Sequence, residues 1–166
     1  TSYEGKIIRV IQKRTADGRI HETAVRPPGT RIIIHDVVKD QILLNQEIRL
    51  DIGQDLRLPG GKICETNAQW DDIKDSPSLN DIIIKSAAEE SRDETAINPL
   101  DLQIFSVSTT GAPTMKHDLY YLVTKKFEIL EHQHLTEDEV ISSLWVPVKE
   151  VISACLTGKI REGRSA

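Results

Sequence analysis

Short apolar runs separated by polar turns predict a chain built largely from β-strands. Residues 7–12 and 20–25 are two such runs, and the Asp17-Gly18 pair between them is a strong signal for a β-hairpin turn. The aliphatic runs at 32–34 and 42–44 lack an alternating polar face, which is typical of strands buried on both sides. The pattern therefore predicts an N-terminal hairpin followed by buried strands.

A helix is predicted from the segment between Ser78 and Asp81 to a point before Pro99. Side-chain oxygens at 78–81 can cap the first turn, and a proline blocks further helix. Small and apolar residues with helical spacing form the stripe expected to face a sheet, namely Ile84, Ala87 or Ala88, Ser91 and Thr95. Small residues on this stripe would let the helix pack closely on the sheet.

Carboxylates gather on one side of the same helix. Glu90, Asp93 and Glu94 are spaced so that they project from one face, where they repel one another unless a cation lies among them. Hard oxygen ligands of this kind suit Mg²⁺ or Mn²⁺. The alternative is an ordinary solvated acidic face. The tight turn Pro59-Gly60-Gly61 upstream favours the metal-site interpretation.

The glycine turn and the acidic helix together resemble a Nudix box, written G-x5-E-x7-R-E-U-x-E-E-x-G-U with U aliphatic. The first glycine falls on Gly61, the R-E pair of the pattern falls on residues 89–90 and its E-E pair on residues 93–94. Residues 65–80 form an insertion that lengthens the family spacing. Its polar, proline-bearing sequence predicts a surface loop.

Four positions depart from the family pattern. The family arginine is Glu89, the last glycine is Ala96, the first glutamate of the second pair is Asp93, and the upstream glutamate is Asn67. Glu65 could substitute for that upstream glutamate. Because glycine relieves strain in a left-handed C-cap, we expect a slightly altered helix exit at Ala96.

The resemblance extends over nearly the whole chain and indicates the branch that hydrolyses ADP-ribose and related nucleoside diphosphate sugars. Residues 41–49 are similar to the family strand ending in Q-Y-R, with Arg49 matching, and residues 57–61 take the place of E-L-P-A-G, with Arg57 at the glutamate. Residues 108–114, which include Gly111, occupy the place of the P-G loop. The resemblance implies an α+β Nudix fold, with a mixed β-sheet sandwiched between helices (α/β/α) and an N-terminal hairpin in residues 1–28.

The resemblance also implies roles for individual residues. Divalent metal, Mg²⁺ or Mn²⁺, would be held by the backbone at Gly61 and by Glu90, Asp93 and Glu94, and Glu90 would also count among the catalytic residues. A carboxylate on the loop before the W-V-P strand, Glu137 or Glu139, would accept the proton of the attacking water. A solvated acidic loop is the alternative for that segment.

Substrate binding would fall to Arg49, Arg57 and the loop at Gly111. A planar guanidinium donates two parallel hydrogen bonds to phosphate oxygens, although arginine is also an ordinary surface residue.

Composition limits the remaining possibilities. The 166 residues suffice for one domain, residues 1–166, and 39% hydrophobic with 28% charged residues indicate a soluble globular protein. No apolar stretch approaches the ~20 residues of a membrane span, so we expect a cytoplasmic protein that does not bind membranes. A net charge of −5 argues against nucleic-acid binding. We expect Cys64 and Cys155 to be reduced, and the last residues to be a clipped or disordered tail.

The resemblance implies a metal-dependent hydrolase that cleaves a nucleoside diphosphate sugar, such as ADP-ribose, into a nucleoside monophosphate and a sugar phosphate. The resemblance further implies a homodimer that pairs through the hairpin. One alternative is a Nudix-fold protein that has lost turnover and binds a nucleotide sugar as a sensor. Another is a pyrophosphohydrolase that prefers nucleoside triphosphates.

Overall fold

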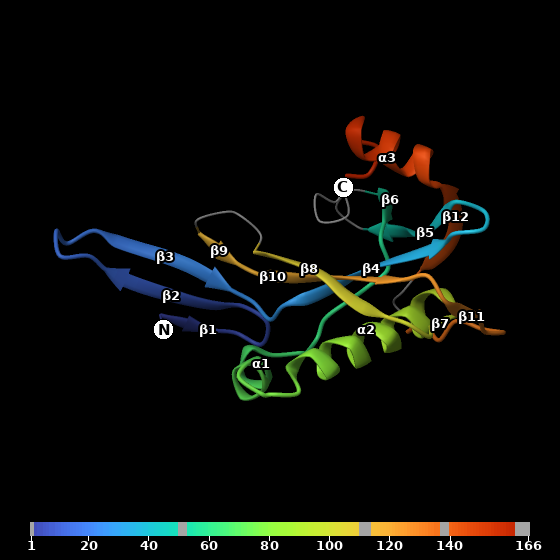
Figure 1. Ribbon diagram of the computed structural model, residues 1–166. Coiled ribbons are helices and arrows are strands. Elements are labelled where there is room, and N and C mark those ends of the chain that lie inside the picture. The colour runs from blue at the N-terminus through green and yellow to red at the C-terminus, as the bar shows by residue number, and fades with distance from the viewer. Residues whose placement is uncertain (1, 50–52, 110–113, 137–139, 162–166) are drawn as a thin grey trace.

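Mixed β-sheets form the centre of the computed structural model, which describes residues 2–49, 53–109, 114–136 and 140–161 (Figure 1). The central sheet has the strand order β12 (Ile141–Pro147), β5 (Gln41–Arg49), β4 (Gly29–Asp36), β10 (Asp118–Thr124) and β8 (Gln103–Thr109), and β6 (Gly53–Arg57) also pairs with β5. The β4–β10 pair is parallel, whereas β5 pairs antiparallel with both β4 and β12. The predicted mixed sheet is confirmed.

Two smaller sheets flank this centre. The N-terminal sheet has the order β1 (Tyr3–Glu4), β2 (Arg9–Arg14), β3 (Ile20–Val25) and β9 (Met115–Lys116). The other sheet pairs β7 (Ile97–Pro99) with β11 (Phe127–Ile129). The β2–β3 hairpin turns at Gly18, whose φ of 86° is readily adopted by glycine, and it projects away from the helices (Figure 1). The predicted hairpin is therefore confirmed.

Helices cover both faces of the central sheet, which confirms the α/β/α arrangement. The helices are α1 (Asn67–Ile73), α2 (Leu79–Thr95) and α3 (Val148–Leu156), and α2 and α3 lie on opposite sides of the sheet (Figure 1). Ile32, Ile34 and Leu43 pack with Ile83 of α2, whereas Leu44 packs with Val151 of α3. The strands are buried on both faces, as their sequences predicted. Among the described residues, no helix combines the length and apolarity needed to span a membrane.

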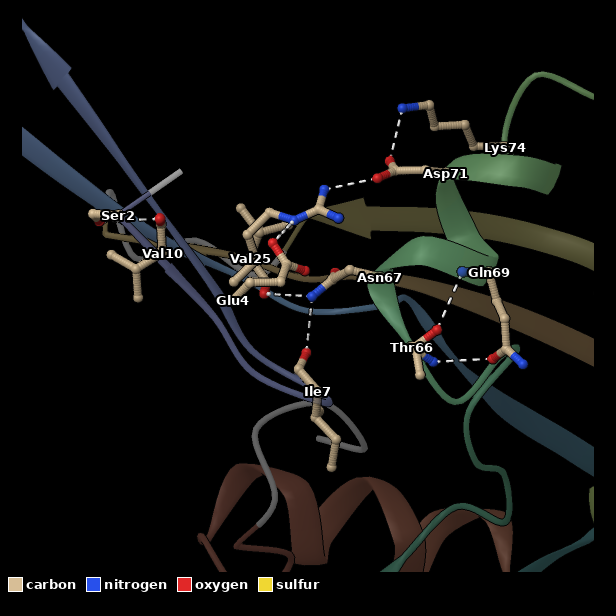
Figure 2. A network of polar contacts seen from close by, with 11 residues as sticks. Ser2, Glu4, Ile7, Val10, Val25, Thr66, Asn67, Gln69, Asp71 and Lys74 are labelled. Carbon is tan, nitrogen blue, oxygen red and sulfur yellow. Dashed lines mark hydrogen bonds and ion pairs between the residues drawn. The ribbon is translucent and has the colours of Figure 1, made fainter.

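The insertion contains a helix, so the prediction of a surface loop was wrong for residues 67–73. Thr66 and Gln69 form a reciprocal capping box at the start of α1. Asn67 is buried and donates hydrogen bonds to the carbonyls of Ile7, at 3.0 Å, and Val25, at 3.3 Å (Figure 2). The helix therefore anchors both ends of the N-terminal hairpin segment.

An ion-pair network adds to this anchor. Arg9 of β2 donates to Asp71 of α1 at 2.7 Å, and Lys74 donates to the same carboxylate at 2.9 Å (Figure 2). Hydrogen bonds from Lys74 and Arg9 hold the pKa of Asp71 below its ordinary value. The insertion is thus a brace between the hairpin and the rest of the molecule.

Helix α2 begins at Leu79, inside the predicted range, and buries Ile83, Ala87, Ser91 and Thr95. Three of these four residues were predicted, and Ile83 takes the place expected for Ile84. The Ser78 side chain makes no capping hydrogen bond. At the other end, Ala96 adopts the left-handed conformation, with φ of 56° and its N–H donating to the carbonyl of Arg92. The expected change of exit is not seen, because the alanine accepts the strained conformation itself.

We predict that Ala96→Gly stabilises the protein by about 1 kcal/mol, because glycine adopts a left-handed conformation without the steric cost that a Cβ imposes. Ala88→Gly, the same substitution inside α2, should instead destabilise by about 1 kcal/mol. Urea denaturation of both variants measures the two effects. Equal destabilisation by both substitutions would contradict the assignment of strain to Ala96.

Candidate functional site

The turn at residues 59–62 is bound to the edge of β4 as if it were a further strand. The amide of Ile32 donates to the Pro59 carbonyl at 2.9 Å, and the amide of Thr30 donates to the Gly61 carbonyl at 2.8 Å. A β-bridge between Gly29 and Lys62 continues the pairing. The turn is therefore fixed by backbone hydrogen bonds to the central sheet.

Both glycines of the turn lie in close contacts that an added Cβ would disturb. Gly60 has φ of 134°, and a Cβ there would lie 2.5 Å from the Thr30 carbonyl oxygen. A Cβ on Gly61 would overlap the carboxylate of Glu90. The carboxylate of Glu90 thus lies directly against the backbone of the turn.

Glu94 is held at the same turn, one helical turn further along α2. Its Oε2 accepts hydrogen bonds from the Gly60 amide and from Nδ2 of Asn45, both at 2.9 Å. Asn45 is buried in β5, and its Oδ1 accepts from the Ser143 hydroxyl of β12 at 2.8 Å. The central sheet and the turn together fix this second carboxylate.

The two carboxylates border a cavity of about 270 Å³. Its charged lining residues are the glutamates 47, 90 and 94 and the cationic Arg26, Arg31, Arg57 and Lys62, and His117 also lines it. Anionic and cationic side chains therefore meet in one cavity. Such a cavity can hold a metal ion together with phosphate oxygens.

Asp93, the third predicted carboxylate, is exposed and borders a neighbouring hollow that also touches Glu90 and Glu94. One carboxylate oxygen of Asp93 lies 3.9 Å from Nδ1 of His134. The acidic face of α2 therefore separates two hollows, and Asp93 lines only one of them.

Arg57 is buried in the wall of the first cavity. Its guanidinium lies 2.6 Å from Asp55 and 3.1 Å from Glu47. Arg57 Nε is buried and has no hydrogen-bond partner among the described residues. The structure therefore places Arg57 in the cavity wall, paired with carboxylates.

The other predicted site residues lie outside what the structure describes. Gly111, Glu137 and Glu139 are outside the described residues. The backbone of Arg49 ends β5, but its side chain is not described. The roles assigned to these four residues remain predictions.

The oxygen atoms at the turn suit a hard divalent cation. Across the described ranges, no three histidine, cysteine, aspartate or glutamate side chains are arranged to hold a metal ion. Mg²⁺ commonly binds proteins through one or two carboxylates and completes its shell with waters and substrate phosphates. Glu90, Glu94 and the carbonyl of Gly61 fit that mode of binding.

Several residues of the site were not predicted from the sequence: Arg31, Glu47 and His117 line the cavity, and Asn45 donates to Glu94. Arg31 and Asn45 adjoin aliphatic runs of buried strands, and a polar residue in such a position was the available signal. Nothing in the sequence shows that Glu47 and His117 reach the same cavity, because their elements meet only through the sheet topology.

No protein-family model matches the sequence, and no curated protein matches it. Solved structures do match. The crystal structure of an ADP compounds hydrolase is similar with a TM-score of 0.65 and 14% identity, over 95% of this chain and 79% of that chain. A structure of MutT, from work on Aliivibrio salmonicida and Vibrio cholerae, is similar with a TM-score of 0.52 and 15% identity, over 76% of this chain and 83% of that chain. Both are Nudix enzymes, so the chain has the Nudix fold.

The two glycines give a prediction that separates folding from the site. Gly60→Ala should destabilise the protein by about 3 kcal/mol, because the new Cβ meets rigid backbone in a left-handed region. Gly61→Ala should fold nearly normally but displace the Glu90 side chain and weaken Mn²⁺ binding. Gly18→Ala, where nothing lies within 4 Å, is the control for left-handed strain alone, at about 1 kcal/mol.

Urea denaturation and Mn²⁺ titration of the three variants test this pattern. Unchanged Mn²⁺ affinity in Gly61→Ala would contradict the placement of Glu90 against the turn.

Proposed function

We propose that this Nudix-fold protein, as one domain of residues 1–166, is a metal-dependent hydrolase of ADP-ribose or a related nucleoside diphosphate sugar. The products are a nucleoside monophosphate and a sugar phosphate. The observation that carries the proposal is the convergence of Glu90 and Glu94 on the backbone of Gly60 and Gly61. The similarity to an ADP compounds hydrolase supports the choice of substrate class.

Charge neutralisation is the first requirement of the reaction, because the negative oxygens of a diphosphate repel a nucleophile. Mg²⁺ or Mn²⁺, when bound, supplies positive charge at these oxygens. Glu90 and Glu94, with the Gly61 carbonyl, would hold the ion, and Asp93 would contribute from the neighbouring hollow that also touches both glutamates. Arg57 stands in the wall of the same cavity, where its guanidinium can bind a phosphate oxygen.

The remaining steps concern proton transfer and substrate placement. Water attacks one phosphorus atom, its oxygen forms the new P–O bond, and the bridging P–O bond breaks. Glu137 or Glu139 accepts the proton of that water, and the leaving phosphate departs as the second product. Arg49 and the loop at Gly111 would position the substrate.

A second candidate function is nucleotide-sugar binding without turnover. It is favoured by Glu89, which occupies the family arginine position, is exposed and lies 4.0 Å from Lys85. A carboxylate there cannot make the hydrogen bonds that an arginine donates to acidic groups. Substrate binding without product formation would support this second candidate.

We predict that the protein with Mg²⁺ or Mn²⁺ hydrolyses members of a panel of nucleoside diphosphate sugars. Glu94→Gln should lower kcat by about 100-fold or more, because the carboxylate held by Gly60 and Asn45 loses its charge. Glu89→Gln, on the same helix but outside the first cavity, should leave activity within about threefold of wild type. Phosphate released after phosphatase treatment measures both. Faster turnover of nucleoside triphosphates would favour a triphosphate pyrophosphohydrolase instead.

A homodimer in the cytoplasm is the form in which we propose that the enzyme works. The hairpin projects from the body of the molecule (Figure 1). Ile8, just before β2, and Ile20, the first residue of β3, are 44% and 51% exposed. Sedimentation equilibrium should therefore give twice the mass of one chain. Ile20→Asp should shift the protein toward monomer, and a monomeric wild type would contradict the proposal.

A further inference from the structure

Arg31 is a buried cation directly before the aliphatic run 32–34 of β4. It lies in β4 before Ile32 and is 5% exposed. Its Nη1 donates hydrogen bonds to the carbonyl oxygens of Thr30 and Gly60, both at 2.9 Å. The guanidinium therefore turns back toward the glycine turn and lines the same cavity as the acidic residues.

Gly60 connects this cation to the acidic face of α2. The Gly60 carbonyl accepts from Arg31, and the Gly60 amide donates to Glu94 at 2.9 Å. One residue of the turn thus joins a permanent positive charge to a carboxylate proposed to bind metal. Because arginine does not deprotonate in proteins, this charge is present at every working pH.

Because Arg31 is buried, its charge acts strongly on neighbouring charged groups. Charges away from water are weakly screened, so a guanidinium beside carboxylates changes their attraction for another cation far more than a surface arginine would. Two other cations of the wall already bind carboxylates, since Arg57 pairs with Asp55 and Lys62 lies 2.6 Å from Glu65. Arg31 in addition bonds to the turn that holds Glu94.

We propose that Arg31 is a resident cation of the cavity. It neutralises part of the charge of Glu90 and Glu94, bonds to the Gly60 carbonyl and thereby lowers the affinity of the cavity for divalent metal. Arg31 is in this sense a positioning and tuning residue for the metal site. The inference rests on the proposed function, because it concerns the same cavity and the ion proposed to act there.

The test is Mn²⁺ binding to the full chain, measured by electron paramagnetic resonance of free Mn²⁺. Arg31→Gln and Arg31→Met remove the charge, and both should bind Mn²⁺ on the order of tenfold more tightly than wild type. Arg31→Lys keeps the charge and should stay within about threefold of wild type. Arg19→Gln, which removes an exposed arginine of the hairpin turn, is the control and should leave Mn²⁺ affinity unchanged.

A purely structural role for Arg31 gives a different pattern. If the guanidinium only fixed the turn, Arg31→Gln and Arg31→Met would bind Mn²⁺ equally or more weakly than wild type, and that result would overturn the inference. Circular dichroism melts identify variants that do not fold, and two neutral replacements guard against the failure of either one.

The same titration separates the inference from the proposed function. Mn²⁺ binding that appears only in the neutral variants supports the resident cation. Wild-type binding without tighter binding in the neutral variants overturns the inference and leaves the proposed function standing. Absence of binding in wild type and in every folded variant overturns both.

Discussion

The crowding of two carboxylates against a glycine turn is the constraint on which the rest of the site depends. Glu90 lies so close to Gly61 that any side chain at that residue would displace its carboxylate, and Glu94 accepts the amide of Gly60. The two carboxylates repel each other at this distance. Hydrogen bonds from N–H groups and a bound cation can offset that repulsion. The site therefore exists only while helix α2 and the turn keep their separation.

The buried face of α2 sets that separation. Ala87 and Ser91 are both fully buried, and these small side chains allow the helix axis to come close to the sheet. The Ser91 hydroxyl donates to the Ile97 carbonyl at 2.8 Å, which ties the helix to β7. On the other side, β4 holds the turn through its backbone. Packing of the buried face of α2 thus positions the carboxylates of Glu90 and Glu94 on another face of the helix.

The hairpin, the buried strands and the acidic face of α2 could be predicted from the sequence, because each depends on a local pattern of residues. The helix in the insertion was missed, although Thr66 and Gln69 have the spacing of a capping box, because its polar composition suggested a loop. Ile84 was predicted on the buried stripe, whereas Ile83 is buried, because residues three and four apart share a helix face and either isoleucine has such a spacing to Ala87. Packing against the sheet decides which one is buried.

The cavity was less accessible to sequence reasoning than the helix. Arg31 and Glu47 come from different strands, and only the sheet topology brings them to Glu90 and Glu94. Arg57 was recognised, but its pairing with Asp55 and Glu47 depends on the register between β5 and β6. Local patterns identified which groups carry charge, and tertiary structure determined which charges meet.

Anomalous diffraction from crystals grown with Mn²⁺ would locate the metal site. We expect an anomalous peak bounded by the carboxylates of Glu90 and Glu94 and by the carbonyls of the glycine turn. A crystal at millimolar Mn²⁺ with no peak at that position, or with manganese bound only elsewhere, would contradict this expectation.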